Sequence, residues 1–309
     1  MSVKSIEEST IVIGVLARDC ANSLTNNIAR VEELGRLFKD YHVVVYENDS
    51  IDSTKVLLQQ WSTKNSHVIA ICEDLKQVTI PKKSKHMVKP SKSIWRIQKM
   101  ANFRNRVLAE VRERFSPDYF CFLDIDIESF SPVAVKESIE NAPSDWGAIC
   151  ASGHLYFTNS NGSSFPANCQ YDAYAFYPEG SEPENMGKRI VSHKWHLVSA
   201  WTAEELVRQY EYAPCLSAFN GLAIYKWEAI KNLQYKALQN KELQSIGASI
   251  CEHMPFHRDI ISNGYKVYIT RHIEVVYFHK KATLLRLFNN WLNVKLAKLY
   301  RSLFFRRYI

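Results

Sequence analysis

The 309-residue sequence lacks several features that mark particular classes of protein. Its seven cysteines are an odd number without any C-x-x-C pair, so they indicate neither a disulfide framework nor a zinc site. No run of about 18 apolar residues predicts a membrane-spanning helix. The first ten residues lack the apolar core of a signal peptide. From these absences we expect a cytoplasmic protein.

An excess of positive charge is also missing from most of the chain. The formal net charge is +7, but residues 275–309 alone contain eight lysines and arginines and no acid. The remainder of the chain therefore carries a net charge of −1. Because nucleic-acid binding requires a basic surface that neutralises phosphates, this distribution argues against a nucleic acid as a partner.

What the sequence does contain is an alternation of apolar strands with helical patterns. Strands are expected over 11–16, 42–46 and 67–72, and helices over 22–38 and 94–115. This alternation is typical of an α/β domain with a mostly parallel central sheet. Ligands bind such sheets beyond the carboxyl ends of the strands. The polar clusters that follow these strands should therefore meet at one edge.

One of these clusters raises an electrostatic question. In "YFCFLDIDIESF" a buried strand runs into Asp124, Asp126 and Glu128, which occupy every second position. Residues two apart in a strand share a face, so these acids would repel unless the strand ends or a cation lies among them. Carboxylate oxygens suit Mg²⁺ or Mn²⁺, which in turn bridge phosphate oxygens. Solvated acids at the end of a strand are the structural alternative.

A basic stretch precedes the acidic one. Residues 82–106 contain nine lysines and arginines and no acid, first in a loop-like segment and then in the helix expected over 94–115. Most of these side chains fit a solvated face. Arg96 and Arg104 are candidates for holding a phosphate group, because a metal diphosphate needs both signs of charge nearby.

A third feature is the stretch from His154 to Ala200. It is rich in Asn, Ser, Gly and Pro and contains many aromatic side chains. We expect a long irregular loop, which in a compact domain is usually functional. Its aromatic rings can pack on sugar faces or simply be buried.

Taken together, the motifs resemble the GT-A-fold glycosyltransferases, which transfer a sugar from a nucleotide diphosphate. "VVVYENDSIDSTKVLLQQW" is similar to their second strand and following helix, and most of all to fungal capsule-associated mannosyltransferases, which carry "YEN-x-S-x-D-x-T". "MANFRNRVLAE" resembles the helix before the metal strand, and "FLDIDIESF" occupies the D-x-D position. "SAFNGLAIYKWEAI" and "CEHMPFHRDIISNGYKVYI" resemble two later segments of family-2 enzymes. The resemblance runs in order from about Ile11 to His279.

The resemblance implies roles for residues of the first half. Asp126 would bind Mn²⁺ or Mg²⁺, and Asp124 the metal or the ribose. Glu47 or Asp49 would contact the base and ribose of a UDP- or GDP-sugar. Arg104 would meet the diphosphate.

The resemblance also implies roles in the second half. The family's "E-D" reads "E-H" here, so Glu252 replaces the usual Asp as the expected general base, and the expected transfer is inverting. His279 follows the strand "IEVVYF" and is a candidate third metal ligand, although a lone histidine is as often structural. His253 and His257 are weaker candidates for a metal.

The expected reaction is transfer of a hexose to a hydroxyl of a glycan or lipid-linked acceptor. Two alternatives remain open at this stage. A metal-dependent nuclease or phosphohydrolase would also use clustered acids, but its two-metal site needs more carboxylates than the motifs supply. The second alternative is a non-catalytic module that recognises glycans or anionic membranes. The transferase should differ from both alternatives by binding a nucleoside diphosphate only with Mn²⁺ or Mg²⁺.

The domain boundaries follow from the motifs and from the tail. We expect one GT-A-like domain over 1–281, with a nucleotide-binding half to about 130, an acceptor half over 131–281, and a basic helical tail over 282–309. In the tail, apolar residues recur at steps of three or four beside lysines and arginines, which is typical of an amphipathic helix on an anionic membrane surface. The apolar positions are Leu285, Phe288, Leu292, Leu296, Leu299 and Leu303. A peripheral location on the inner face of a membrane is thus a further possibility, and packing on protein is the alternative.

Overall fold

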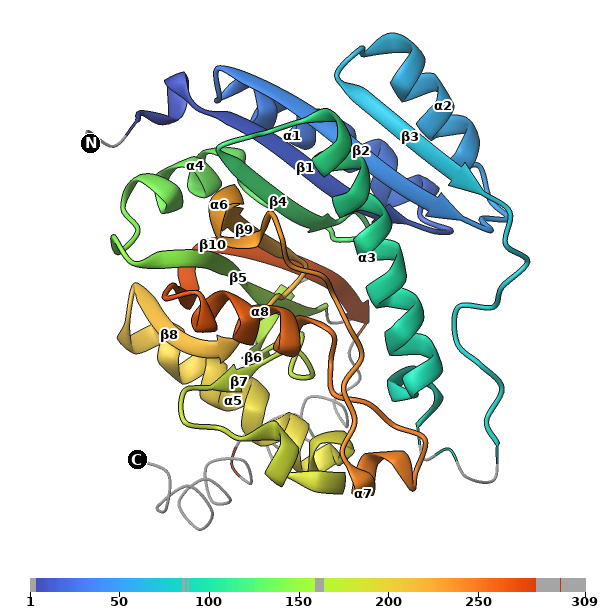
Figure 1. Cartoon of the computed structure of the whole chain (residues 1–309), viewed down its shortest axis with the longest axis vertical. Coiled ribbons are helices and arrows are strands. Elements are labelled where there is room, and N and C mark those ends of the chain that lie inside the picture. The colour runs from blue at the N-terminus through green and yellow to red at the C-terminus, as the bar shows by residue number, and fades with distance from the viewer. Residues whose placement is uncertain (1–3, 85–86, 88, 159–163, 282–294, 296–309) are drawn as a thin grey trace.

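One mixed sheet of ten strands runs through the centre of the structure (Figure 1). The structure is a computed structural model and describes residues 4–84, 87, 89–158, 164–281 and 295. The strands are β1 (Thr10–Ala17), β2 (Asp40–Asn48), β3 (Val68–Glu73), β4 (Tyr119–Asp124), β5 (Trp146–Thr158), β6 (Ser164–Gln170), β7 (Tyr177–Pro178), β8 (Tyr212–Ser217), β9 (Leu222–Lys226) and β10 (Lys266–Lys281). The α/β fold class expected from the sequence is confirmed.

The strand order is β3-β2-β1-β4-β9-β5-β10-β8-β7, with β6 paired to β5. The strands β3, β2, β1 and β4 are parallel, as expected. Beyond β4 the sheet becomes mixed, because β9 is antiparallel to both β4 and β5, whereas β5 and β10 are parallel. A strand buried on both faces is equally apolar in either direction, so its direction cannot be read from composition.

Helices cover both faces of the sheet. The α-helices are α1 (Ala21–Arg36), α2 (Thr54–Lys64), α3 (Ile94–Arg114), α4 (Pro132–Glu140), α5 (His193–Gln209), α6 (Trp227–Ile230), α7 (Lys241–Gln244) and α8 (His253–Ser262). Short 3-10 helices are η1 (Ile6–Glu8), η2 (Pro90–Lys92), η3 (Pro183–Asn185) and η4 (Gly187–Val191). One hydrophobic core joins the sheet to α1, α2 and α4, and a second joins its other face to α3, α5 and α8. The sheet is therefore shielded from water on both sides.

Helix α1 begins one residue before the predicted start, and one acid links its start to that of α2. Asp52 accepts a hydrogen bond from the backbone N–H of Thr54 at the start of α2 (3.0 Å). Its other oxygen accepts from the N–H of Ala21 at the start of α1 (3.0 Å). Because both N–H groups lack partners within their own helices, one carboxylate satisfies two helix ends. This contact holds the loops after β1 and β2 side by side.

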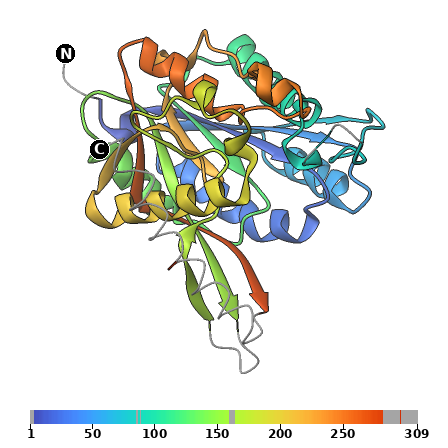
Figure 2. The same ribbon diagram turned by 90° about the horizontal axis from the view of Figure 1, so that it is seen from below.

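The expectation of a long irregular loop over 154–200 is wrong at both ends of the stretch, whereas residues 171–192 contain only β7 and the short helices η3 and η4. Strand β5 continues to Thr158, β6 returns antiparallel to it, and α5 begins at His193. In Figure 2 the ends of β5, β6 and β10 project from the body of the domain as a ribbon. Strand pairing rather than composition decides this region, because Asn and Ser are tolerated on the exposed faces of a hairpin.

The predicted basic tail over 282–309 lies outside the described residues, apart from Lys295. Its membrane role therefore stays a prediction. Among the residues that the structure describes, no helix is long and apolar enough to cross a membrane. The division into nucleotide and acceptor halves at about residue 130 also stays a prediction, and one sheet runs through both halves.

Candidate active site

A cavity of about 330 Å³ opens at the carboxyl ends of the parallel strands. Its walls come from the ends of β1, β2 and β4, from one side of α3, and from the segments before β7 and α8. Six of the residues singled out in the sequence line this cavity, namely Arg96, Arg104, Asp124, Asp126, Glu252 and His253. The structure thus brings together side chains that are far apart in the sequence, since Arg104 and Glu252 alone are separated by 148 positions. This is the edge at which an α/β sheet is expected to bind its ligand.

The three acids of the stretch do not line one face of a strand, because the strand ends at the first of them. Strand β4 stops at Asp124, and the following residues form a turn in which Asp126 is exposed. Buried Ile125 and Ile127 anchor this turn, and their carbonyl oxygens accept hydrogen bonds from the side chain of Asn27 on α1 (3.1 and 2.8 Å). Glu128 also lies in the turn but does not line the cavity. Only the first two acids of the stretch therefore face a ligand.

Arg104 is the positive charge that the protein itself places among these acids. It lies on α3, is only 3% exposed, and pairs through Nη2 with Asp124 (3.7 Å) and through Nε with Glu252 (3.3 Å). Phe122 and Phe219 hold the guanidinium between their rings, at 4.9 and 4.7 Å from the ring centres. Its Nη1 has no hydrogen-bond partner among the described residues. That donor remains free for a ligand.

The carboxylates of the cavity outweigh the charge of Arg104. Burial raises the pKa of Asp124 to about 7, since the attraction of Arg104 is opposed by Asp126 and Asp172. Burial together with Glu252 raises the pKa of Asp172 to about 6. Carboxyl groups whose pKa values rise in this way favour the arrival of another cation. The donor set therefore fits Mg²⁺ or Mn²⁺, which prefer carboxylate oxygens.

Glu252 lies at the N-cap position of α8, but its side chain does not cap the helix. The residue precedes His253 at the start of the helix, but its side chain makes no capping hydrogen bond. Instead its carboxylate is 5% exposed, accepts from Arg104, and lines the cavity. A role limited to helix capping is thus excluded by the contacts. The carboxylate of Glu252 is therefore positioned either for a function in the cavity or only to balance the charge of Arg104.

A pair of stacked tyrosines forms the opposite wall. Tyr277 on β10 donates a hydrogen bond to Asp124 (3.3 Å), and Tyr171 stacks on its ring with the centroids 3.5 Å apart. Gly221 lies beneath, in a left-handed conformation with φ 85°, and a Cβ there would be 2.8 Å from the hydroxyl of Tyr277. A residue with a Cβ would collide with this hydroxyl and would be strained at a positive φ, so the position favours glycine. Tyr171 is 42% exposed and offers an open aromatic face.

Two predicted nucleotide contacts have other partners in the structure. Glu47 is fully buried and accepts from the N–H of Ser50 (2.7 Å). Asp49 accepts from the N–H groups of Lys76 and Gln77 (2.7 and 3.0 Å). Neither lines the cavity, whereas Asn48 between them does. Both acids hold the loops around the site, and their role toward a nucleotide stays a prediction.

Three histidines are candidates for the metal in the sequence, namely His253, His257 and His279. His257 is buried between Ser217 and Tyr225, each 3.1 Å from one of its ring nitrogens. His253 is buried against Phe219, and burial together with Arg104 keeps its pKa well below the usual range. His257 is therefore a neutral core residue. His253 is also neutral, but it lines the cavity and neither ring nitrogen has a hydrogen-bond partner among the described residues, so its metal role stays a prediction. His279 lies on β10 in register with Tyr156, but its side chain is outside the described part of the chain, so its metal role stays a prediction.

Sequence reasoning missed Tyr277, which belongs to no motif and faces Asp124 only in the fold. Asp172 lies with Tyr171 in "QYDAYAF", which has only a faint resemblance to an acceptor-side motif of the capsule enzymes. Arg18 lines the cavity from the end of β1 and reaches Asp49 (3.7 Å). Its position after an apolar strand was the one available signal, because polar clusters after parallel strands meet at one edge.

Arg104→Met is expected to destabilise the metal-free protein by about 3–5 kcal/mol, because it leaves Asp124 and Glu252 as buried acids without their cation. Urea unfolding of metal-stripped protein measures this. Arg106→Met on the same helix is the matched control, since Arg106 is exposed and pairs with Glu73 at 3.2 Å. Its loss should cost about 1 kcal/mol or less. Equal midpoints for the two variants would mean that Arg104 does not balance the buried acids.

A comparison with protein families gives one match. The family model described as "Cryptococcal mannosyltransferase 1" matches residues 10–259, which include β1 to β9 and most of α8. No protein of curated function matches the sequence. The resemblance to nucleotide-sugar glycosyltransferases that the sequence motifs suggested is thereby confirmed.

Similar solved structures include a mannosyltransferase from Pyrobaculum calidifontis, in complex with GDP-Man and Mn²⁺ (10% identity, TM-score 0.46, 87% of this chain). The chain spans 56% of that protein's length. Another is TarS 1–349 of S. aureus (12% identity, TM-score 0.42, 94% of this chain and 65% of that one). A third is the glucosyl-3-phosphoglycerate synthase of Mycobacterium tuberculosis with Mn²⁺, UDP and product (12% identity, TM-score 0.44, 95% and 80% of the two chains).

Proposed function

The chain belongs to the family described as Cryptococcal mannosyltransferase 1 and is a glycosyltransferase, and we propose that it transfers a hexose from a GDP- or UDP-sugar to a hydroxyl of a glycan or lipid-linked acceptor in a metal-dependent reaction. The observation that carries the proposal is the convergence of Asp124, Asp126, Arg104 and Glu252 in one cavity at the carboxyl ends of the parallel strands. The family match sets aside the nuclease and the non-catalytic module. Mannose is the first donor sugar to test, because the family is described by mannosyl transfer.

The donor would lie along the ends of β1, β2 and β4. Leu16, Ala17, Tyr46 and Asn48 line that end of the cavity and would receive the nucleoside. The free Nη1 of Arg104 would donate to a diphosphate oxygen. Charge-assisted hydrogen bonds from a guanidinium to phosphate are among the strongest in proteins. Placing the diphosphate here leaves the sugar facing Asp172 and Glu252.

Asp124 and Asp126 would hold Mn²⁺ or Mg²⁺ against the diphosphate. When bound, the ion supplies Lewis-acid stabilisation of the leaving group. The residues fit this ion because Asp126 is exposed within the turn and burial raises the pKa of Asp124. Tyr277 and Arg104 orient Asp124 from two sides, so its oxygens are preorganised. The buried acids would then be balanced without further protonation.

The acceptor would enter beside Tyr171 and meet a carboxylate base. The open ring of Tyr171 is suited to the apolar face of a sugar. Glu252 is the proposed base that takes the proton of the attacking hydroxyl, with inversion at the donor carbon. Its contact with Arg104 fixes its position but also draws its charge toward the guanidinium. Asp172, which has no cation within hydrogen-bond distance among the described residues, is the second candidate for the same role.

Nucleotide titration tests the function directly. GDP and UDP should bind in the presence of Mn²⁺ or Mg²⁺, and at least tenfold more weakly in EDTA, because the acids of the cavity repel a bare diphosphate. Calorimetry measures both affinities, and hydrolysis of GDP-mannose and of UDP-sugars identifies the donor. Metal-independent binding of equal strength would contradict the proposed metal dependence. Absence of binding with every nucleotide and metal would contradict the proposed function.

We also propose that the tail at 283–309 places the enzyme on an anionic membrane surface, where each basic residue near the lipid contributes about 1 kcal/mol. Sedimentation with vesicles rich in anionic lipid should retain the full chain and lose a chain that ends at residue 282. Leu292→Gln with Leu296→Gln keeps the charge and breaks the apolar stripe, so it should bind more weakly than the full chain. Equal sedimentation with and without the tail would contradict the role of the tail.

A further inference from the structure

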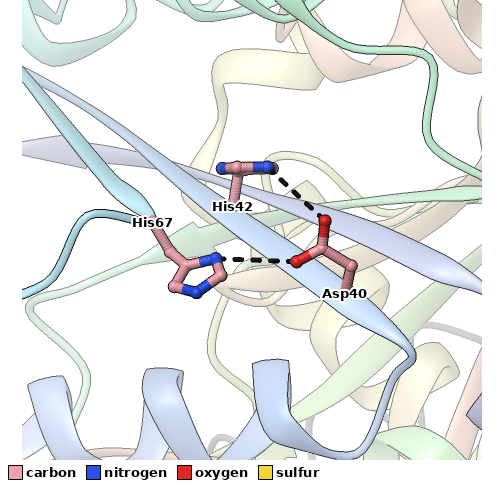
Figure 3. Close-up of side chains that lie close together, drawn as sticks. All are labelled: Asp40, His42 and His67. Carbon is pink, nitrogen blue, oxygen red and sulfur yellow. Dashed lines mark ion pairs between the residues drawn. The ribbon is translucent and has the colours of Figure 1, made fainter.

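Three side chains of the types that bind metal ions lie at the amino ends of the parallel strands, whereas the candidate active site lies at their carboxyl ends. Asp40 and His42 lie at the start of β2, and His67 lies immediately before β3 (Figure 3). The carboxyl end of β2 lies eight residues beyond Asp40, which is about 26 Å along an extended strand. The cluster therefore has no part in holding a donor diphosphate.

We propose that Asp40, His42 and His67 form a site for a divalent transition metal of the Zn²⁺ type. The carboxylate of Asp40 lies 3.8 Å from Nε2 of His42 and 3.6 Å from Nδ1 of His67. One ligand atom from each of the three residues lies within 4.8 Å of the others. In a tetrahedral Zn²⁺ site with bonds of about 2.0–2.1 Å, neighbouring ligand atoms are about 3.4 Å apart. Side-chain shifts on the order of 1 Å complete that geometry.

The fold holds both rings in position without a metal. His42 stacks on Phe115, with ring centroids 4.2 Å apart, and His67 stacks on Tyr41 at 4.5 Å. Asp40 and His42 are two apart on β2 and so share one face. All three side chains are partly or well exposed, at 51%, 30% and 40% for Asp40, His42 and His67. A metal ion can thus reach ligands that are already close together.

One existing hydrogen bond shows what the metal would replace. Nδ1 of His67 lies 2.7 Å from the carbonyl oxygen of Tyr41, so this nitrogen carries a proton in the metal-free protein. A metal ion on Nδ1 would take the place of that proton, and the neutral ring would then carry its one proton on Nε2. The Tyr41 carbonyl oxygen or a water molecule would then fill the fourth position. Burial lowers the pKa of His42, which favours the neutral ring that ligation needs.

The types of ligand atom also distinguish this site from the one at Asp124 and Asp126. Two imidazoles with one carboxylate suit Zn²⁺, Co²⁺, Ni²⁺ or Cu²⁺, whereas Mg²⁺ and Mn²⁺ favour oxygen ligands. Strand β3 is the edge strand of the sheet and is paired only to β2 among the described strands. A metal bound to His67 and to β2 would therefore tie the edge strand to its neighbour. The expected consequence is a more stable protein rather than a more active one.

The test is a calorimetric titration of the full, tag-free chain with Zn²⁺ in saturating Mg²⁺. The absorption spectrum of the Co²⁺-bound protein is a second measurement, which reports tetrahedral ligation. Wild type should bind one equivalent and melt at a higher temperature with Zn²⁺. His67→Ala and the isosteric Asp40→Asn should each lower the affinity roughly 10- to 100-fold or more. Circular dichroism shows whether these variants keep the fold.

Two control variants make the assignment specific. His272→Ala removes an exposed histidine that also lies 3.8 Å from a carboxylate, that of Glu211, and it should bind Zn²⁺ as wild type does. Asp126→Asn removes the proposed active-site ligand and should likewise leave Zn²⁺ affinity unchanged. The assignment is overturned if wild type binds no Zn²⁺ in Mg²⁺, if folded Asp40→Asn and His67→Ala bind normally, or if Asp126→Asn abolishes binding.

Discussion

Asp126→Asn should reduce sugar transfer by at least 100-fold and abolish metal-dependent nucleotide binding, with the fold unchanged. The substitution keeps the shape of the side chain but removes the charge that holds a divalent cation. Asp126 is exposed in the turn after β4, so it makes few contacts that the fold depends on. Its melting temperature should therefore stay close to that of wild type. Turnover of the donor sugar and calorimetry with Mn²⁺ and nucleotide measure the effect.

Glu128→Gln is the matched control for this prediction. It removes an acid two positions further along the same turn, outside the cavity. Activity and nucleotide affinity should both remain within about twofold of wild type, because Glu128 is exposed to water and offers no ligand atom to the cavity. Full activity of Asp126→Asn, or of wild type in excess EDTA, would contradict the metal assignment. Equal losses in both variants would indicate a general charge effect in place of a metal ligand.

The part of the site that could be predicted comes from residues with a fixed relation to an element. Asp124 and Asp126 follow an apolar strand, Arg104 lies on a long helix with a clear pattern, and Glu252 precedes a helix. Each position follows from local periodicity together with the rule that parallel strands end at one edge. The structure places all four in one cavity.

The residues of the site that the sequence predicts poorly are placed by contacts between segments that are distant in the sequence. Tyr277 reaches the cavity because β10 pairs with β5, and Asp172 does so because its N–H donates to the side chain of Asn220 (3.1 Å). Glu47 looks like a ligand in the sequence, but in the fold it accepts from the backbone N–H of Ser50 and lies 3.9 Å from Lys55. Loop hydrogen bonds of this kind leave no periodic pattern. Sequence analysis alone therefore locates the metal side of the cavity better than the acceptor side.

Glu252→Gln should reduce turnover roughly 10²- to 10⁴-fold and leave nucleotide and metal affinity unchanged. Gln keeps the size of the side chain and can still contact Arg104, but it cannot accept a proton from the attacking hydroxyl. The lack of a capping contact at this residue means that helix α8 loses little. Single-turnover kinetics with a saturating donor measures the chemical step. Asp259→Asn, in the same helix and paired with Lys236 at 2.8 Å, is the control that should keep its rate.

Asp172→Asn decides what a failure of this prediction means. If Glu252→Gln turns over at the wild-type rate and Asp172→Asn does not, the base is Asp172, whose pKa of about 6 leaves it largely ionised at neutral pH. Near-wild-type rates in both variants would leave the reaction without a carboxylate base. The inverting proposal would then fall in favour of a retaining transfer, in which the leaving diphosphate itself takes the acceptor proton. Proton NMR of the first product formed shows the anomeric configuration and settles which of these reactions occurs.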